Sequence, residues 1–499
     1  MKFERSSGII LHPTSFPGPD GMGDIGPEAY HWINTIIEMG CSLWQILPLG
    51  PTGYGDSPYQ CFSAFAGNPY LISSVLLREE GFLSRKDFGD RPEFPDGNIQ
   101  YGEVIHWKLT LLDRAYKNYQ NSFTENYRHI FEVFTNEQSF WLDDFAMFMA
   151  IKEANQSVSW NQWPLELRLR EQNALKRFKT EYAADIERHA FRQFLFFRQW
   201  NNLRKFANEK KIKIIGDIPI FVAYDSADAW AHPELFHLDN NGDPTVVAGV
   251  PPDYFSPTGQ LWGNPIYRWE HHKDTGYAWW IQRIKTTLDQ VDIIRLDHFR
   301  GFAGYWEIPA GMPTAEIGKW VSGPGDSIFN ALEGTLGKMP IIAEDLGRLT
   351  PDVIELRDKF GFPGMKILQF SFDSDSSNPF LPHNFVENCV AYTGTHDNDT
   401  TLGWYKTAPQ TQRDFCRRYL ASSGNDISWD MIRAVWRSVA IMTLAPIQDI
   451  LSLGTGARMN YPGKPGGNWN WRMQPNAITL ELIERVRELN HLYGRESAF

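Results

Sequence analysis

Cysteine and long apolar runs are both scarce in this chain of 499 residues. The four cysteines, Cys41, Cys61, Cys389 and Cys416, are widely separated and form no CxxC pair. This excludes a disulfide framework and gives a zinc site no local support, so we expect reduced, buried thiols. The short run Ile9–Leu11 falls below the roughly 7–15 apolar residues of a secretory signal, and no stretch reaches the ~20 of a membrane span. We therefore expect a cytoplasmic protein with no membrane partner.

An excess of basic residues is also missing. The chain has 48 Lys and Arg against 60 Asp and Glu, a net charge of −12. A protein whose main partner is a nucleic-acid backbone would need a basic patch. We expect no nucleic-acid partner and interpret the acidic balance as a feature of a soluble surface.

The chain does contain eight short apolar runs that end in polar residues. Buried parallel strands read as continuous apolar runs of this kind. Helical spacing lies between many of them, as in Pro27–Met39 and in Pro351–Lys359, which follows Thr350 as an N-cap. The runs are Gly8–Leu11, Leu43–Leu47, Ile212–Ile215, Ile293–Leu296, Ile341–Ala343, Met365–Phe370, Val390–Tyr392 and Met442–Ile447.

Eight strands that alternate with helices predict an α/β fold, a (β/α)8 TIM barrel, with the active site at the C-terminal ends of the strands. A doubly wound open sheet is the alternative, but no Gly-rich dinucleotide fingerprint follows the first run. The uneven spacing predicts two insertions in a single catalytic barrel spanning 1–499. One, roughly 75–180, has helical periodicity. The other, roughly 223–285, is rich in aromatics and contains a long irregular loop, Val246–Tyr267.

Aromatic residues make up 14% of the chain, and many lie in Gly- and Pro-rich stretches. Aromatic side chains in loops over a cleft suit the apolar faces of sugar rings, although about half of them are equally explained as plugs that hold loops in place. The stretches contain Tyr54, Tyr59, Tyr254, Trp262, Tyr267, Trp469 and Trp471.

Three segments at predicted strand ends carry acids suited to glycosidic bond cleavage, which needs a carboxylic acid and a second carboxylate. Arg295 and Asp297 are two residues apart, so both point to one side of a strand, where the guanidinium favours the ionised form of a nucleophile. Glu344 follows an apolar strand and is a candidate general acid. The cluster around His396 and Asp397 suits sugar hydroxyls, with a metal site as the competing reading. A structural ion pair and a helix cap are the alternatives for the first two segments.

Taken together, these segments resemble the amylomaltases, the 4-α-glucanotransferases of glycoside hydrolase family 77 and relatives of the α-amylases. The resemblance runs from Gly8 to about Met473, and its motifs gain weight from their joint order. They are Asp56–Gln60, Gly216–Val222, Val246–Tyr267, Arg295–His298, Ala343–Gly347, Gly394–Thr400 and Ala457–Asn460.

The resemblance implies a role for each matching position. Asp297 is expected to be the nucleophile, Glu344 the acid and base, and Asp397 the carboxylate that binds and distorts the sugar at the cut. The other positions are expected to bind substrate. Arg295, His298, Asp217 and His396 would surround that sugar, Tyr59 would stack beneath it with Ser57 alongside, and Gln260, Trp262, Asp373 and Asn460 would line neighbouring subsites.

The resemblance further implies a monomer that acts on α-1,4-glucans and maltooligosaccharides without a metal or cofactor. The alternatives are an α-glucan hydrolase that uses the same carboxylates and a non-catalytic glucan-binding protein. Transfer requires that a sugar rather than water attack the intermediate, so we expect the loop with Trp262 to close over the acceptor side.

Overall fold

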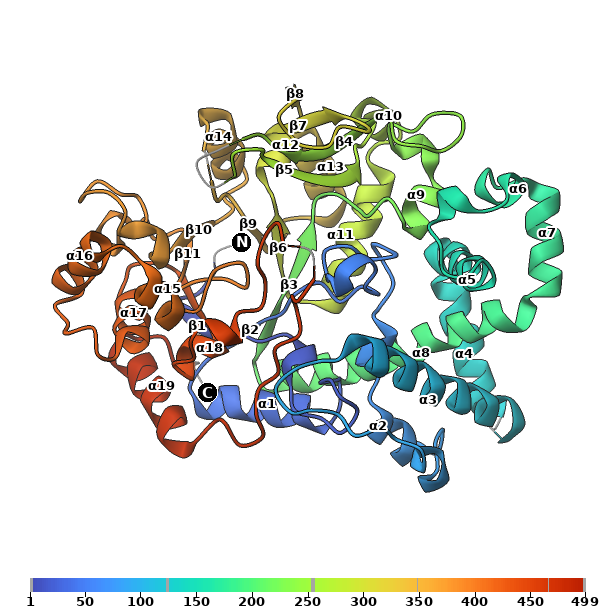
Figure 1. Ribbon diagram of the computed structural model, residues 1–499, viewed down its shortest axis with the longest axis horizontal. Coiled ribbons are helices and arrows are strands. Elements are labelled where there is room, and N and C mark those ends of the chain that lie inside the picture. Colours follow the sequence, from blue (N-terminus) through green and yellow to red (C-terminus); the bar gives the residue numbers. More distant parts are fainter. Residues whose placement is uncertain (1–2, 123–124, 253–255, 348, 465, 497–499) are drawn as a thin grey trace.

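The computed structural model describes residues 3–122, 125–252, 256–347, 349–464 and 466–496. Eight parallel strands close a barrel in the order β1-β12-β11-β10-β9-β6-β3-β2, with helices around it (Figure 1). The predicted (β/α)8 barrel is confirmed, and every strand overlaps one predicted apolar run. The strands are β1 (Ser6–Ile10), β2 (Leu43–Gln45), β3 (Lys213–Pro219), β6 (Ile293–Asp297), β9 (Ile341–Ala343), β10 (Gly364–Ile367), β11 (Cys389–Tyr392) and β12 (Met442–Pro446).

The strands are mostly apolar because both of their faces are buried. Alternate residues such as Ile10, Ile293 and Tyr392 belong to one buried cluster inside the barrel. Their neighbours, such as Ile9 and Ile294, belong to the larger cluster that packs against the surrounding helices. Side chains of a strand point alternately to its two faces, so a strand between two apolar layers shows no polar alternation.

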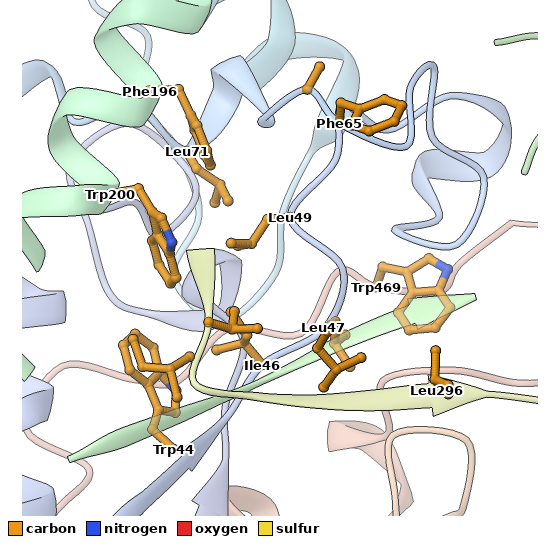
Figure 2. Packing of buried hydrophobic residues seen from close by; sticks show 14 of the residues in the cluster. Trp44, Ile46, Leu47, Leu49, Phe65, Leu71, Phe196, Trp200, Leu296 and Trp469 are labelled. Carbon is orange, nitrogen blue, oxygen red and sulfur yellow. The ribbon is translucent and has the colours of Figure 1, made fainter. Parts of the chain in front are cut away.

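The outer layer is built from amphipathic helices. In α1 (Pro27–Glu38) the buried residues include Ala29, Trp32, Ile33 and Ile36, which is the predicted helical spacing. Figure 2 shows Trp44, Ile46, Leu47 and Leu49 of β2 and its extension in one cluster with Phe196 and Trp200 of α8 (Ala183–Glu209). Other helices around the barrel are α11 (Ala278–Gln290), α12 (Arg300–Ala303), α13 (Asp326–Leu336), α14 (Pro351–Lys359), α15 (Thr401–Thr407), α16 (Gln410–Leu420), α17 (Ile427–Trp436), α18 (Ile447–Ile450) and α19 (Leu480–Leu492).

Thr350 occupies the N-cap position of α14 with an extended backbone, as predicted, but its side chain makes no capping hydrogen bond. The predicted start of the helix is therefore correct, although the side-chain hydrogen bond expected of an N-cap residue is absent.

The helices of residues 75–180 lie together at one side of the barrel (Figure 1). They pack on α8 through aromatic contacts, such as the stacked rings of Tyr119 and Phe191, whose centroids are 4.6 Å apart. They are α2 (Ser74–Glu79), α3 (Tyr101–Ser122), α4 (Glu125–Glu137), α5 (Ser139–Ala154), α6 (Leu165–Arg168) and α7 (Gln172–Glu181).

The expectation that Val246–Tyr267 is an irregular loop is wrong. The segment contains β4 (Val246–Val250) and β5 (Gln260–Pro265) of a second, antiparallel sheet of order β5-β4-β7-β8. This sheet lies above the barrel in the view of Figure 1, with β7 (Gly304–Pro309) and β8 (Lys319–Ser322). A bulge between Val247 and Gly249 and the prolines at 251–252 disguise the strand pattern. The same insertion holds α9 (Ala227–Ala231) and α10 (Trp269–Asp274), while Tyr254 lies outside the described residues.

Cys41, Cys389 and Cys416 are buried free thiols as expected, whereas Cys61 is partly exposed. Within the described ranges, no helix combines the length and the apolar character needed to cross a bilayer.

Candidate active site

Arg295 holds two carboxylates at the C-terminal ends of neighbouring strands β3 and β6. The β3–β6 register places Asp217 directly opposite Arg295. Arg295 Nη1 donates to Asp217 Oδ2 at 2.6 Å and to Asp297 Oδ1 at 2.8 Å. The Arg295 and Asp217 side chains are buried, whereas 26% of the Asp297 side chain remains exposed. Of the two carboxylates, Asp297 is therefore the one that faces the open end of the barrel.

The charge of Arg295 is secured by these partners. Burial alone would lower the pKa of Arg295, but the charges of Asp217 and Asp297 outweigh it and raise the pKa above its ordinary value. The guanidinium thus remains a fixed positive charge beside Asp297.

Glu344 follows β9, the next strand in the barrel, and its carboxyl is held by two backbone amides. The N–H of His298 donates to Oε2 at 2.7 Å, and the N–H of Leu346 donates to Oε1 at 2.8 Å. Burial and the nearby charge of Asp297 raise the pKa of Glu344 to about 8, against the opposing effects of Arg295 and the two amides. Glu344 therefore carries a proton at neutral pH, as a general acid must.

The geometry of Glu344 depends on an unusual backbone at His298. His298 has a φ of +55°, the left-handed region that few residues other than glycine adopt. This conformation follows directly on Asp297 and turns the His298 N–H toward Glu344. Burial lowers the pKa of the His298 side chain to about 4, so the imidazole is neutral at neutral pH.

Asp397 lies beyond the end of β11, and two side chains hold it. Asn460 Nδ2 donates to Asp397 Oδ1 at 2.6 Å, and His396 Nε2 lies 3.3 Å from Asp397 Oδ2. Burial favours a raised pKa for Asp397, but His396 and Asn460 lower it well below its usual range. The pKa of His396 is raised, because the charge of Asp397 overcomes the opposing effect of burial. Asp397 is thus an anion with 44% of its side chain open to a ligand.

Tyr59 connects the two groups of acids. Its hydroxyl donates to Asp217 Oδ2 at 2.8 Å and lies 2.8 Å from His396 Nε2. Its ring stacks on His396 at 5.3 Å between centroids and meets Trp469 at 5.7 Å. One hydrogen-bonded network therefore runs from Asp397 through His396, Tyr59 and Asp217 to Arg295 and Asp297.

Asp297 and Asp397 border a cleft of about 340 Å³ at the open end of the barrel. It brings together eight of the site residues that the sequence predicts. They are Ser57, Tyr59, Gln260, Trp262, Asp297, His298, Asp397 and Asn460. Asp217, Arg295, Glu344 and His396 are not part of the lining and lie behind it, in contact with the residues that are.

Trp262 and Gln260 form the β5 side of the cleft. Trp262 Nε1 donates to Gln260 Oε1 at 3.2 Å, and the Trp262 ring meets the edge of His298 at 4.8 Å between centroids. Ser57 shapes the opposite turn by accepting from the N–H of Tyr59 at 3.2 Å.

Asp373 is not brought to the cleft. It lies in an exposed stretch after β10, where its carboxylate accepts from Asn378 Nδ2 at 3.0 Å.

The sequence did not predict several residues that line the cleft, namely Gln60, Asn264, Tyr461, Lys464 and Asn468. The last three lie between Asn460 and Trp469, and the signal for them was a run of glycine, proline and aromatics after the last barrel strand, similar to the one that pointed to Trp262.

A metal site around His396 and Asp397 was the alternative interpretation of that cluster. In the part of the chain that the structure describes, no group of three or more His, Cys, Asp or Glu residues is arranged to hold a metal ion. His396 and Asp397 are bonded to each other, to Tyr59 and to Asn460 instead.

Comparisons with known proteins agree along the whole chain. A family model described as 4-alpha-glucanotransferase matches residues 11–479. The 4-alpha-glucanotransferase of Thermus thermophilus is 50% identical over 98% of this chain and 99% of its own length, and that of Synechocystis is 48% identical over 99% of each. The amylomaltase of Streptococcus agalactiae, solved with acarbose, superposes with a TM-score of 0.96 at 39% identity over 99% of this chain and 100% of that one.

A Geobacillus thermoleovorans α-amylase, with a TM-score of 0.50 and 11% identity over 99% of this chain and 79% of that one, shares only the fold. Since the family model covers residues 11–479 and the two relatives above cover 98% and 99% of the chain, the chain belongs to the 4-alpha-glucanotransferase family, glycoside hydrolase family 77.

Proposed function

We propose that this protein transfers a segment of an α-1,4-glucan from a donor maltooligosaccharide to the 4-hydroxyl of an acceptor glucan or glucose, with retention through a covalent glycosyl-enzyme. One observation carries the proposal. On neighbouring strands β6 and β9, one carboxylate is paired with a fixed cation and the other holds a proton. A nucleophile and a general acid are the two groups that a retaining mechanism needs.

In the first step Asp297 attacks the anomeric carbon while Glu344 gives its proton to the leaving glycosidic oxygen. The bond to the reducing-end fragment breaks, and an ester bond to Asp297 forms. Arg295 is already bonded to Asp297 Oδ1 and holds the carboxylate in one orientation. We expect the two carboxyls to lie about 5–5.5 Å apart when substrate is bound, the spacing that retention requires.

In the second step Glu344, now ionised, takes the proton of the acceptor 4-hydroxyl, whose oxygen displaces Asp297 from the anomeric carbon. Asp397 is the third carboxylate in this proposal and binds ring hydroxyls of the sugar at the cut. Its anionic state and its open face support that role. The network through Tyr59 fixes it relative to Asp297.

Incubation with maltotriose tests the proposal against the hydrolase alternative. Transfer gives a ladder of longer and shorter oligosaccharides, because each glycosyl-enzyme can be captured by another sugar. A mixture that contains only shorter products would identify a hydrolase. Loss of turnover in the Asp297→Asn and Glu344→Gln variants would exclude a non-catalytic binding protein.

We also propose that residues 1–499 act as one catalytic unit, and that the protein works as a monomer in the cytoplasm. The two insertions border the barrel rather than forming a separate chain of domains (Figure 1). Light scattering of the purified protein tests the oligomeric state, since a mass of twice 57.5 kDa would contradict the monomer.

A further inference from the structure

The lining residues between Asn460 and Trp469 form one wall of the cleft, and Arg458 and Asn460 connect this wall to Asp397. We propose that Arg458 is a positioning residue that couples this wall to Asp397, so that one guanidinium both aims the carboxylate and supports the surface on which the glucan lies. The inference rests on the role proposed above for Asp397.

Arg458 binds two backbone carbonyls that belong to the residues around the carboxylate. Its Nη2 donates to the carbonyl oxygen of Asp397 at 2.6 Å, and its Nε donates to that of Asn460 at 2.7 Å. Asn460 in turn donates from Nδ2 to Asp397 Oδ1 at 2.6 Å and from its backbone N–H to the His396 carbonyl at 3.2 Å. The guanidinium therefore closes a ring of bonds with Asp397 and Asn460 as its other members.

The same guanidinium lies against a wall residue. Its carbon is 4.4 Å from the ring centre of Tyr461, which lines the cleft. The ammonium of Lys464 lies 4.7 Å from the same ring centre. A cation over an aromatic face stabilises the ring in place. Tyr461 is thus a residue of the cleft wall that Arg458 supports.

The wall has its own bonds, which make it a unit rather than a loose loop. Asn468 Oδ1 accepts from the N–H of Tyr461 at 3.0 Å, and Asn468 Nδ2 donates to the Lys464 carbonyl at 3.0 Å. The N–H of Trp469 donates to the Met459 carbonyl at 2.7 Å. Arg458 joins this unit to the loop after β11, because its Nη2 donates to the backbone carbonyl of Asp397.

The chemistry of an arginine suits this position. The planar guanidinium presents several donors in a fixed fork, so it can serve two carbonyls and still stack on Tyr461. A lysine has the charge but no fork, and a methionine has a similar stem without donors. Because Arg458 is only half-buried, water can replace its donors at both carbonyls, and we expect the variants to fold.

The test is a double-mutant cycle between Arg458 and Asp397, measured as kcat and KM for maltotriose. We expect Arg458→Met to lower kcat about 100-fold, because a carboxylate displaced by about 1 Å loses that much of its effect. KM should change by less than roughly threefold. The kcat of Arg458→Lys should lie between those of wild type and Arg458→Met. In an Asp397→Asn background the further loss from Arg458→Met should be smaller than roughly threefold, since the group that it aims is already gone.

Thermal unfolding serves as the control for structure. Arg417→Met is the matched variant, because Arg417 on α16 also pairs with neighbours, Tyr405 and Asp414, but lies outside the cleft. It should keep wild-type kcat. An equal loss from Arg458→Met in both backgrounds would overturn the coupling, and so would a change of less than threefold in wild type. Near-normal activity of Asp397→Asn alone would overturn the role of Asp397 first, and the two failures are thereby distinguished.

Discussion

The backbone N–H of His298 donates to Glu344 Oε2 at 2.7 Å, so the residue that directly follows Asp297 holds the second carboxyl of the pair. This single bond ties the geometry of the two acids together across strands β6 and β9. It exists because His298 adopts a left-handed backbone, with a φ of +55°. Strain of this kind persists where the surrounding structure enforces it, and here it serves the placement of Glu344.

The raised pKa of Glu344 predicts the alkaline limb of the pH profile. In the proposed mechanism Glu344 gives its proton to the leaving oxygen, and above pH 8 that proton is lost. We expect kcat/KM for maltotriose to fall about tenfold per pH unit above an apparent pKa near 8. A plateau that extends to pH 10 would contradict this assignment. So would the same alkaline limb in Glu344→Gln assayed with a glycosyl fluoride donor, whose leaving group needs no acid.

The same pKa predicts how stability depends on pH. The carboxyl has an ordinary pKa of 4.5 and a folded pKa of about 8, so between these values the folded protein holds a proton that the unfolded chain releases. The stabilising contribution of that proton is complete below pH 4.5 and is lost as the pH rises to about 8.

Glu344→Gln removes this dependence because glutamine does not titrate. We expect the melting temperature of Glu344→Gln relative to wild type to rise between pH 5 and pH 9, by roughly 2 °C or more. Differential scanning calorimetry across this range measures it. A difference that stays constant with pH would show that the pKa of Glu344 is not raised.

The buried pair between Arg295 and Asp217 predicts a cost in both stability and turnover. Asp217→Asn removes a charge whose side chain is fully buried and leaves Arg295 with Asp297 alone. Loss of one partner of a buried pair costs about 3 kcal/mol, which should appear as a lower melting temperature together with reduced kcat. Asp90→Asn breaks the exposed pair with Arg114 and serves as the control, with no expected change in either quantity.

Trp262 predicts the balance between transfer and hydrolysis. If its ring helps to exclude water from the acceptor side, Trp262→Ala should raise the ratio of free glucose released by hydrolysis to transfer products by roughly threefold or more. Trp320→Ala is a matched control, because Trp320 lies on β8, at the other edge of the same sheet, and is exposed away from the cleft. An unchanged ratio in Trp262→Ala would refute this function of the ring.

The barrel was predictable from the sequence because each of its strands is marked by a pattern within a few consecutive residues. Each strand lies in a short, mostly apolar run that has polar residues at or shortly after its C-terminal end, such as Asp297 at the end of Ile293–Asp297. The sheet around β4 was not predictable, because the pairing of β4 with β7 joins segments on either side of β6 and the pairing of β4 with β5 contains a bulge.

Much the same holds for the site. The acids at strand ends were visible as single residues, and the resemblance to a family assigned them expected roles. The bond from His298 to Glu344, the two carbonyls bound by Arg458 and the exposed position of Asp373 depend on how separate loops meet. No spacing within one segment reports such contacts, and for Asp373 the structure shows a partner in Asn378 rather than a place in the cleft.

The covalent intermediate on Asp297 is the central claim, and mass spectrometry of a trapped enzyme tests it most directly. Glu344→Gln is incubated with a maltosyl fluoride that lacks its non-reducing 4-hydroxyl. The fluoride leaves without an acid, and the missing general base then prevents release. We predict that the peptide containing Asp297 gains the mass of one maltosyl group that lacks this hydroxyl. Fluoride release with the adduct on any other residue, or with no adduct at all, would contradict it.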